Sequence, residues 1–318
     1  MGLAQRALCS RGHRVGETPL VVLGLNPALE ITCFLPQPTP GVTSARRQNI
    51  EPGGKGTNVA RILAALGLRV SLIMPLDGPL AAGFAESLRP NIEIVRVPGG
   101  PPMRASVVLV TDNSPEPTIV RVAGEATPTF GTRALDALRH TIGVGTLFII
   151  SGSLPDGLST DYYAECVAHA KELGARTVID VPPPALTPCL ASGPEFVIPN
   201  EYEAMASTGT HSAADAARAL VARGARTAIV TRGAQGIVVG HTDGVTTYAT
   251  KPVDELNGAG AGDAFTAGFV HAIADGASFE RALNVGASLG AAAVTMPGSG
   301  ILPDVCPVPD DMLTAGHQ

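Results

Sequence analysis

The sequence has no tryptophan, and phenylalanine, tyrosine and tryptophan together make up only 4% of its 318 residues. This shortage of large rings disfavours an aromatic-rich β sandwich. Alanine, valine and glycine are abundant instead, with 37 glycines in the chain. Small and β-branched side chains suit helices packed closely on a parallel sheet, so the composition favours an α/β protein.

Cysteine is scarce as well. The five cysteines are odd in number and scattered, with no CxxC pair, which favours a reduced, cytoplasmic protein. The seven histidines form no HExxH or Cys/His cluster that would hold zinc. No apolar run is long enough for a membrane span, and a net charge of −6 argues against non-specific binding to nucleic acid.

The first residues of the chain form a basic segment. Arg6, Arg11 and Arg14 precede the first acid, Glu17, but no apolar stretch of the kind found in a secretory signal lies between them. We therefore expect a disordered tail over residues 1–18 rather than a targeting segment.

Strands and helices alternate along the remaining chain. Apolar runs predict buried strands over residues 19–25, 70–74, 146–152, 176–181, 194–200 and 226–233. Helical spacing predicts helices over 52–67, 160–174, 212–224, 263–275 and 279–294. Such alternation indicates a mostly parallel central sheet with helices on both faces, and ligands of such sheets bind at the carboxyl ends of the strands.

Two further segments look different from this core. Residues 27–51 are β-branched and interrupted by prolines, and residues 103–123 read as a hairpin that turns through DNSPEP. We expect these segments to form a small β lid beside the main sheet. No linker or repeat divides the chain, so residues 19–314 are predicted to be one domain carrying this lid.

The most informative motif is NGAGAGDAF, from Asn257 to Phe265. Its glycines, Gly258, Gly260 and Gly262, fit two interpretations: a tight turn into a helix, or a loop whose N–H groups hold an anion. Asp263 favours the second interpretation. A carboxylate in that place should repel a bound phosphate, so its presence makes sense if it removes a proton during phosphoryl transfer. The motif matches neither GxxxxGK[ST] nor the dinucleotide fingerprint of a flavodoxin- or dinucleotide-type oxidoreductase.

Two other motifs also have a purely structural alternative. In PGGKGTNVA, residues 52–60, Lys55 and Asn58 can bind hydroxyls or phosphate, or the segment is a plain glycine turn with a solvent-exposed lysine. In PNEYE, Asn200 and Glu203 share one helical face as ligands, or they are a capping asparagine and a solvent-exposed glutamate.

Together with LNPALE, SGSLPDGL and VTRGAQG, these motifs resemble the ribokinase-like carbohydrate kinases of the phosphofructokinase B type. The resemblance extends from about Leu20 to Pro303 and follows the order of the family's motifs. Within the family, the motifs resemble the sugar-phosphate branch more than ribokinase or adenosine kinase. That branch includes 1-phosphofructokinase and tagatose-6-phosphate kinase.

The resemblance implies transfer of the ATP γ-phosphoryl group to a sugar hydroxyl, with Mg²⁺ as cofactor and ATP as co-substrate. It assigns Asp263 as catalytic base and Gly260, Ala261 and Gly262 as the anion hole. It also assigns Asn200 and Glu203 to positioning the metal ion, largely through water. The implied acceptor-binding residues are Glu30, Gly53, Gly54, Lys55, Asn58 and Arg104. The implied nucleotide-binding residues are Thr231, Gly233, Gly236, Asn257, Gly258 and Asn284.

The chain departs from the family pattern on the acceptor side. Glu30 stands where relatives have aspartate, Val42 and Ser44 replace basic residues of the lid, and Arg46 and Arg47 should point to opposite faces. A sugar phosphate such as fructose 1-phosphate, fructose 6-phosphate or tagatose 6-phosphate is the first prediction. A non-phosphorylated sugar or nucleoside is the alternative, followed by a non-catalytic sugar or nucleotide sensor. Exposed lid strands also predict a homodimer.

Overall fold

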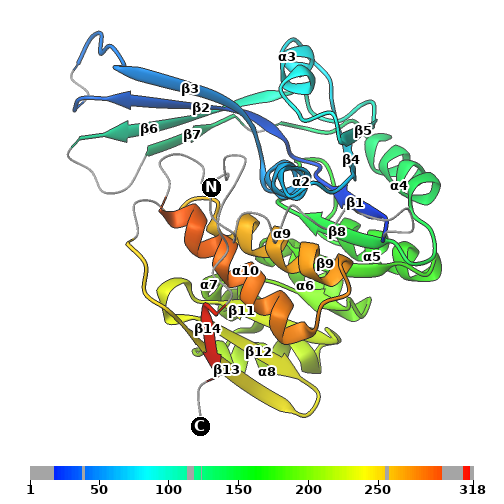
Figure 1. Ribbon diagram of the computed structural model, residues 1–318. Helices are drawn as coiled ribbons and strands as arrows, with labels where there is room; N and C mark the ends of the chain where they lie inside the picture. Colours follow the sequence, from blue (N-terminus) through cyan, green and yellow to red (C-terminus); the bar gives the residue numbers. More distant parts are fainter. Residues whose placement is uncertain are drawn as a thin grey trace.

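The computed structural model describes residues 18–37, 40–112, 118–122, 124–254, 258–295 and 311–315. Residues 1–17 of the predicted tail lie outside this description. The described chain forms one large sheet with helices on both faces and a separate four-stranded sheet at one end (Figure 1). The predicted α/β class and the second sheet are therefore confirmed.

Seven strands of the large sheet run parallel, in the order β11-β10-β9-β8-β1-β4-β5. Their bounds are β1 Leu20–Leu23, β4 Val70–Met74, β5 Ile92–Arg96, β8 Leu147–Ser151, β9 Arg176–Asp180, β10 Phe196–Val197 and β11 Thr227–Thr231. The strand predicted over 194–200 is thus only two residues long, because Pro199 lacks the N–H that a continuing strand needs.

Three antiparallel strands that the sequence pattern did not indicate extend the sheet beyond β11. They are β12 Ile237–His241, β13 Gly244–Thr250 and β14 Leu313–Ala315. Of these, β14 is far from its partner β13 in the sequence, so no local pattern could have paired them.

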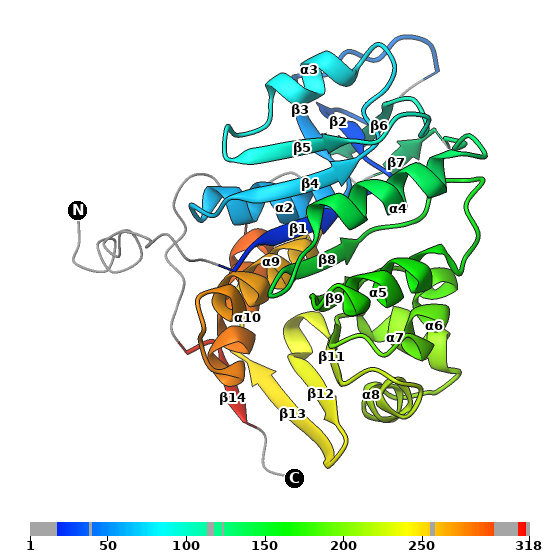
Figure 2. The same ribbon diagram turned by 90° about the vertical axis from the view of Figure 1, so that its right-hand side faces the viewer.

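Side chains of β1 show how the helices cover both faces. Leu20 and Val22 belong to the buried cluster formed with α2, α9 and α10, whereas Val21 and Leu23 pack in the cluster formed with α4, α5, α6 and α8. Figure 2 shows these two groups of helices on opposite sides of the sheet. Successive side chains alternate in this way because they point to opposite faces of a strand, and both faces of this sheet are buried. The bounds of the helices are α2 Lys55–Ala65, α3 Ala81–Glu86, α4 Phe130–Thr141, α5 Tyr162–Glu172, α6 Pro183–Ala191, α7 Glu201–Thr208, α8 Ala213–Ala222, α9 Ala261–Ala274 and α10 Phe279–Val294.

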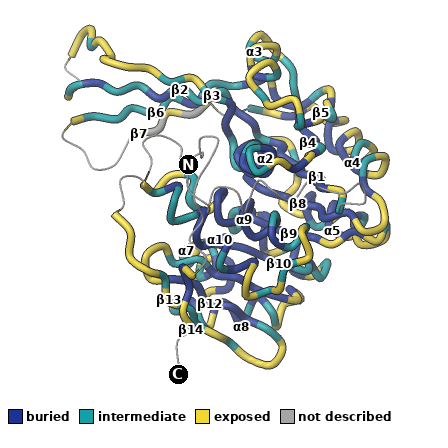
Figure 3. The backbone as a smooth tube through the Cα atoms, viewed as in Figure 1, coloured by how far each residue is buried: buried dark blue, intermediate teal, exposed yellow. Residues whose placement is uncertain are grey.

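The small sheet extends away from this core, and its strands are more exposed than those of the central sheet (Figure 3). Its order is β3-β2-β6-β7, with β2 Ala28–Leu35, β3 Arg47–Gly53, β6 Arg104–Thr111 and β7 Thr118–Arg121. Glu30 of β2 lies directly opposite Glu51 of β3 on one side and Ser106 of β6 on the other. Partners in such a row share one face of the sheet.

The strand β3 continues almost directly into α2 through a glycine turn. Gly54 precedes the helix at φ 96°, a left-handed conformation that L side chains rarely adopt. A Cβ atom on Gly56 would lie 2.7 Å from Gly24 Cα and 3.0 Å from the Ser151 carbonyl oxygen. These glycines place the first turn of α2 against the carboxyl ends of β1 and β8. No described helix combines the length and the apolar content needed to cross a lipid bilayer.

Candidate active site

The predicted base lies in the first turn of α9. Gly260 precedes the helix in the left-handed conformation, at φ 82°, and Ala261 and Gly262 are its first two residues. A Cβ atom on Gly262 would meet nothing within 4 Å, so an incoming group can approach this backbone closely. The Asp263 side chain is buried, at 5% exposure, and its Oδ2 accepts a 2.8 Å hydrogen bond from Asn58 Nδ2 on α2.

The surroundings of Asp263 make its carboxyl a weak acid. Burial raises the pKa of Asp263 to about 7, and the charge of Asp180 adds to the rise. Lys55 and the Asn58 hydrogen bond act in the opposite direction and lower this pKa. A carboxylate that titrates near neutrality is suited to take a proton from a hydroxyl at working pH.

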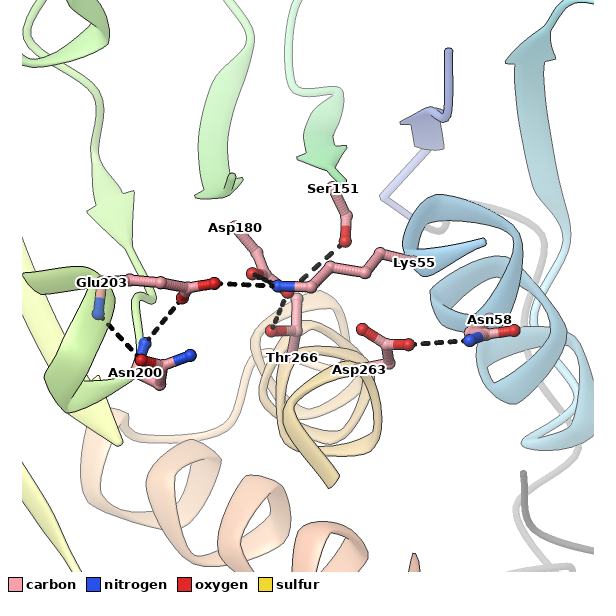
Figure 4. A network of polar contacts seen from close by, with 8 residues as sticks. All are labelled: Lys55, Asn58, Ser151, Asp180, Asn200, Glu203, Asp263 and Thr266. Carbon is pink, nitrogen blue, oxygen red and sulfur yellow. Dashed lines mark hydrogen bonds and ion pairs between the residues drawn. The ribbon is translucent and has the colours of Figure 1, made fainter. Parts of the chain in front are cut away.

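Lys55 connects two further carboxylates beside Asp263 (Figure 4). Its Nζ lies 3.2 Å from Asp180 Oδ1 and 3.4 Å from Glu203 Oε1. The attraction of Asp180 is the main reason that the pKa of Lys55 is raised, so this ammonium group stays charged. Asp180 is 3% exposed and also accepts hydrogen bonds from the hydroxyls of Ser151 and Thr266.

Asp180 and Thr266 are not among the residues that the sequence assigned to the site. A signal for Asp180 was present, because it is the second-last residue of the predicted strand 176–181, close to the carboxyl end where ligands of parallel sheets bind. Its role depends on contacts with α2 and α9, which the sequence could not place.

Asn200 and Glu203 form the capping box that the sequence left open as an alternative. The Asn200 side chain accepts a hydrogen bond from the Glu203 N–H, and Glu203 Oε2 accepts one from the Asn200 N–H. The glutamate is not a solvent-exposed residue, however, because its side chain is only 18% exposed and its other oxygen contacts Lys55. The capping box therefore fixes Glu203 so that its Oε1 atom lies next to Lys55.

A cavity of about 240 Å³ opens between the small sheet and α2. Five of the predicted site residues line it: Glu30, Gly54, Lys55, Arg104 and Glu203. The other lining residues are Gly24, Asn26, Pro27, Ala28, Gly56, Thr57, Ser106, Ser151, Gly152, Ser153 and Pro182. Gly53 is not among these lining residues, but a Cβ atom on it would stand 3.1 Å from the Cβ of Glu30, which is. We call this space the acceptor cavity.

Two hydroxyl groups of the acceptor cavity mark it as a place for polar ligands. Thr57 and Ser106 are 1% and 4% exposed, and neither hydroxyl oxygen has a hydrogen-bond partner within the described part of the chain. Buried polar groups of this kind are rare and usually find a partner in a ligand or water. Thr57 belongs to α2 and Ser106 to β6, so they approach the cavity from the core and from the small sheet.

Other basic residues of the small sheet are engaged elsewhere. Arg46 forms an ion pair with Asp112, and the Arg47 guanidinium lies over the Phe34 ring. Arg104 lines the cavity while donating to the carbonyls of Val122 and Asn26, at 3.1 and 3.4 Å. Lys55 and Arg104 are thus the cations among the described lining residues of this cavity.

A second cavity, of about 300 Å³, lies at the start of α9 beside α10. Predicted residues in its lining are Thr231, Gly233, Gly236, Gly258, Ala261 and Gly262. Small residues of α10, Ala287, Gly290 and Ala291, form another wall, and Lys251 and Met312 line it as well. Asn257 lies outside the described residues. Asn284 lies apart from this lining, because its side chain accepts a hydrogen bond from the Leu313 N–H in β14.

Asp263 therefore stands between two cavities. Its neighbour Gly262 lines the second, and its partner Asn58 belongs to the helix whose first turn lines the acceptor cavity. A buried carboxylate between two cavities, with helix N–H groups beside it, is the arrangement expected of enzymes that transfer a group from one bound molecule to another.

Comparison with known proteins gives the particular family. The family model described as pfkB family carbohydrate kinase matches residues 20–305. The chain is 33% identical to 1-phosphofructokinase of Rhodobacter capsulatus over 290 residues, which cover 84% of this chain and 90% of that protein. It is 28% identical to ATP-dependent 6-phosphofructokinase isozyme 2 of Escherichia coli, over 88% of this chain and 94% of that one.

Solved structures agree with this assignment. Phosphofructokinase-2 of Escherichia coli superposes with a TM-score of 0.82 at 26% identity, over 89% of this chain and 95% of that one. Ribokinase of Thermotoga maritima, at 19% identity and a TM-score of 0.69, shares the fold over 92% and 96% of the two chains. The chain belongs to the pfkB family of carbohydrate kinases, and it is a phosphotransferase that acts on a hydroxyl group.

Proposed function

We propose that this kinase transfers the γ-phosphoryl group of ATP to a hydroxyl of a sugar phosphate of the fructose 1-phosphate, fructose 6-phosphate or tagatose 6-phosphate type. The observation that carries the proposal is the position of buried Asp263 between a cavity containing Lys55 and Arg104 and a cavity of small residues at the start of α9. An arginine suits a phosphate group because its planar fork can bind two oxygens. The names of the relatives support the same substrate class.

In this proposal Asp263 orients the acceptor hydroxyl and takes its proton as the bond to phosphorus forms. The N–H groups of Gly260, Ala261 and Gly262 stabilise the charge on the transferred group, an effect worth about 2.7–4 kcal/mol for one donor in a comparable oxyanion hole. Asn58 holds the Asp263 carboxylate in place. The nucleotide occupies the second cavity, between β11 and α10.

Mg²⁺ fits the site as an ion held mainly by the phosphates of ATP and by water. No group of three or more acidic, histidine or cysteine side chains suited to direct coordination occurs among the described residues. Glu203 can still accept hydrogen bonds from water on the ion, since each carboxylate oxygen has two lone pairs. Asn200 fixes Glu203 through the capping box. When bound, the ion would neutralise charge on the phosphates.

A non-phosphorylated acceptor is the second candidate, and the charges of the acceptor cavity favour it. Lys55 already contacts two carboxylates, Arg104 donates to two backbone carbonyls, and Glu30 and Glu203 add negative charge to the lining. Carboxylates accept hydrogen bonds from sugar hydroxyls but repel a phosphate.

An acceptor panel separates the two candidates. ADP release would be measured with Mg²⁺ and ATP on fructose 1-phosphate, fructose 6-phosphate, tagatose 6-phosphate, fructose, ribose and adenosine, with Asp263→Asn as the blank. We expect turnover with at least one sugar phosphate and little with the free sugars. Turnover confined to free sugars or adenosine would establish the second candidate. ATP binding without turnover of any acceptor would indicate a sensor.

We further propose that residues 19–314 are one kinase domain, with residues 27–51 and 103–123 as its lid, and that two copies join through the lid. Ile50, Val120 and Val122 of the lid are more than half exposed, and an open sheet edge presents unpaired backbone groups. Light scattering at micromolar concentration should give the mass of a dimer. The mass of a single chain would contradict this proposal.

A further inference from the structure

Arg61 lies on α2 one turn beyond Asn58 and connects this helix with strand β3. Its guanidinium donates a hydrogen bond to the Pro52 carbonyl, and its Nη2 lies 3.8 Å from Glu51 Oε2. The Arg61 side chain is only 17% exposed. An arginine that is largely shielded from water and has carboxylate and carbonyl partners fixes geometry more firmly than a fully exposed ion pair does.

Glu51 faces a second carboxylate across the small sheet. Glu30 and Glu51 are directly opposed in the β2–β3 register, so their side chains leave the same face of the sheet. Like charges in such a pair repel each other and destabilise the pairing of the strands. Glu30 also lines the acceptor cavity, so the repulsion acts where the sugar would bind.

We propose that Arg61 is a positioning residue that neutralises the Glu30–Glu51 pair and thereby holds strand β3 and the Glu30 carboxylate in place at the acceptor cavity. This inference rests on the proposed function in one respect, namely that the acceptor binds in this cavity. It gives Arg61 a role in acceptor affinity and none in binding ATP, because its contacts are with the lid strand.

Two other cations near this pair have contacts of their own within the described part of the chain. Lys55 contacts Asp180 and Glu203, and Arg104 contacts the carbonyls of Val122 and Asn26. Burial lowers the pKa of Arg61 while the charges of Glu51 and Glu30 raise it, and an arginine remains a cation under these conditions. Glu51 contacts Arg61 directly, and Glu30 lies opposite Glu51 in the strand register.

A charge-balance experiment tests the role. With the acceptor that the wild-type enzyme phosphorylates, Arg61→Met should raise the acceptor KM about tenfold, while the KM for ATP changes less than about twofold. Arg61→Lys should give an intermediate KM. Glu51→Gln in the Arg61→Met background should restore most of the acceptor affinity, because it removes one of the two repelling charges. Arg96→Met, which breaks the exposed ion pair of Arg96 with Asp77, is the matched control.

A second measurement does not depend on turnover. Amide hydrogen exchange over residues 47–53 should be faster in Arg61→Met than in wild type or Arg96→Met, and Glu51→Gln should slow it again. An unchanged acceptor KM in Arg61→Met, or a double variant no better than Arg61→Met in KM and exchange, would overturn the inference. Wild-type protein that phosphorylates no acceptor of the panel would overturn the proposed function instead, and the exchange experiment would still decide the role of Arg61.

Discussion

Replacing Asp263 by asparagine is expected to lower kcat by about three orders of magnitude and to leave the affinity for ATP unchanged. Three orders correspond to about 4 kcal/mol of transition-state stabilisation. Asparagine has nearly the same shape and can still accept the hydrogen bond from Asn58, but it cannot take the proton of the acceptor hydroxyl. Steady-state rates and equilibrium ATP binding of the purified variant provide the measurement.

The control for this variant is Asp275→Asn, an exposed aspartate at the other end of α9. It should turn over at the wild-type rate. If Asp263→Asn keeps near-normal turnover, Asp263 is not the base.

The raised pKa of Asp263 gives this prediction a pH signature. In the wild type kcat/KM should fall as the pH drops below about 7, because the base becomes protonated. The folded-state pKa exceeds the unfolded value of 3.8, so this group makes the folded protein more stable as the pH falls from about 7 towards 4. Asp263→Asn removes that dependence. Its melting temperature relative to wild type should therefore be higher at pH 8 than at pH 5.

The second large effect is expected for Lys55→Met. The acceptor cavity loses a cation, and the buried Asp180 carboxylate loses its charged partner. Removing one member of a buried ion pair is strongly destabilising, by about 3–5 kcal/mol, and the partial exposure of Lys55 reduces this value. We expect kcat/KM for the acceptor to fall by about two orders of magnitude or more, with a lower melting temperature.

The pH profile distinguishes this role from general damage. Lys55 lowers the pKa of Asp263, so its loss raises that pKa and moves the acid limb of kcat/KM to higher pH. Lys171→Met on the exposed side of α5 is the control and should leave rate and profile unchanged. An acid limb that stays at the wild-type pH in Lys55→Met would show that Lys55 does not act on Asp263.

The local sequence was sufficient to predict the parallel core and the glycine turns that lead into α2 and α9. Alternating strands and helices predicted the central sheet, because burial on both faces requires continuous apolar strands such as β1 and β8. Glycines before Lys55 and Asp263 predicted turns into helices over 52–67 and 263–275, and the helices begin close by, at Lys55 and Ala261. The resemblance in motif order then indicated the family that the comparisons show.

Only the tertiary structure decided which side chains meet. Asn58 donates a hydrogen bond to Asp263, which is 205 positions away in the chain. Lys55 forms ion pairs with Asp180 and Glu203, and Asn284 accepts a hydrogen bond from β14. These contacts are between different elements, so the hydrophobic period within one element does not predict them. Sequence patterns report burial and backbone conformation within one element. The charges that tune Asp263 and the cation that holds Glu51 come from separate elements, so they emerge only when the sheet and its helices pack together.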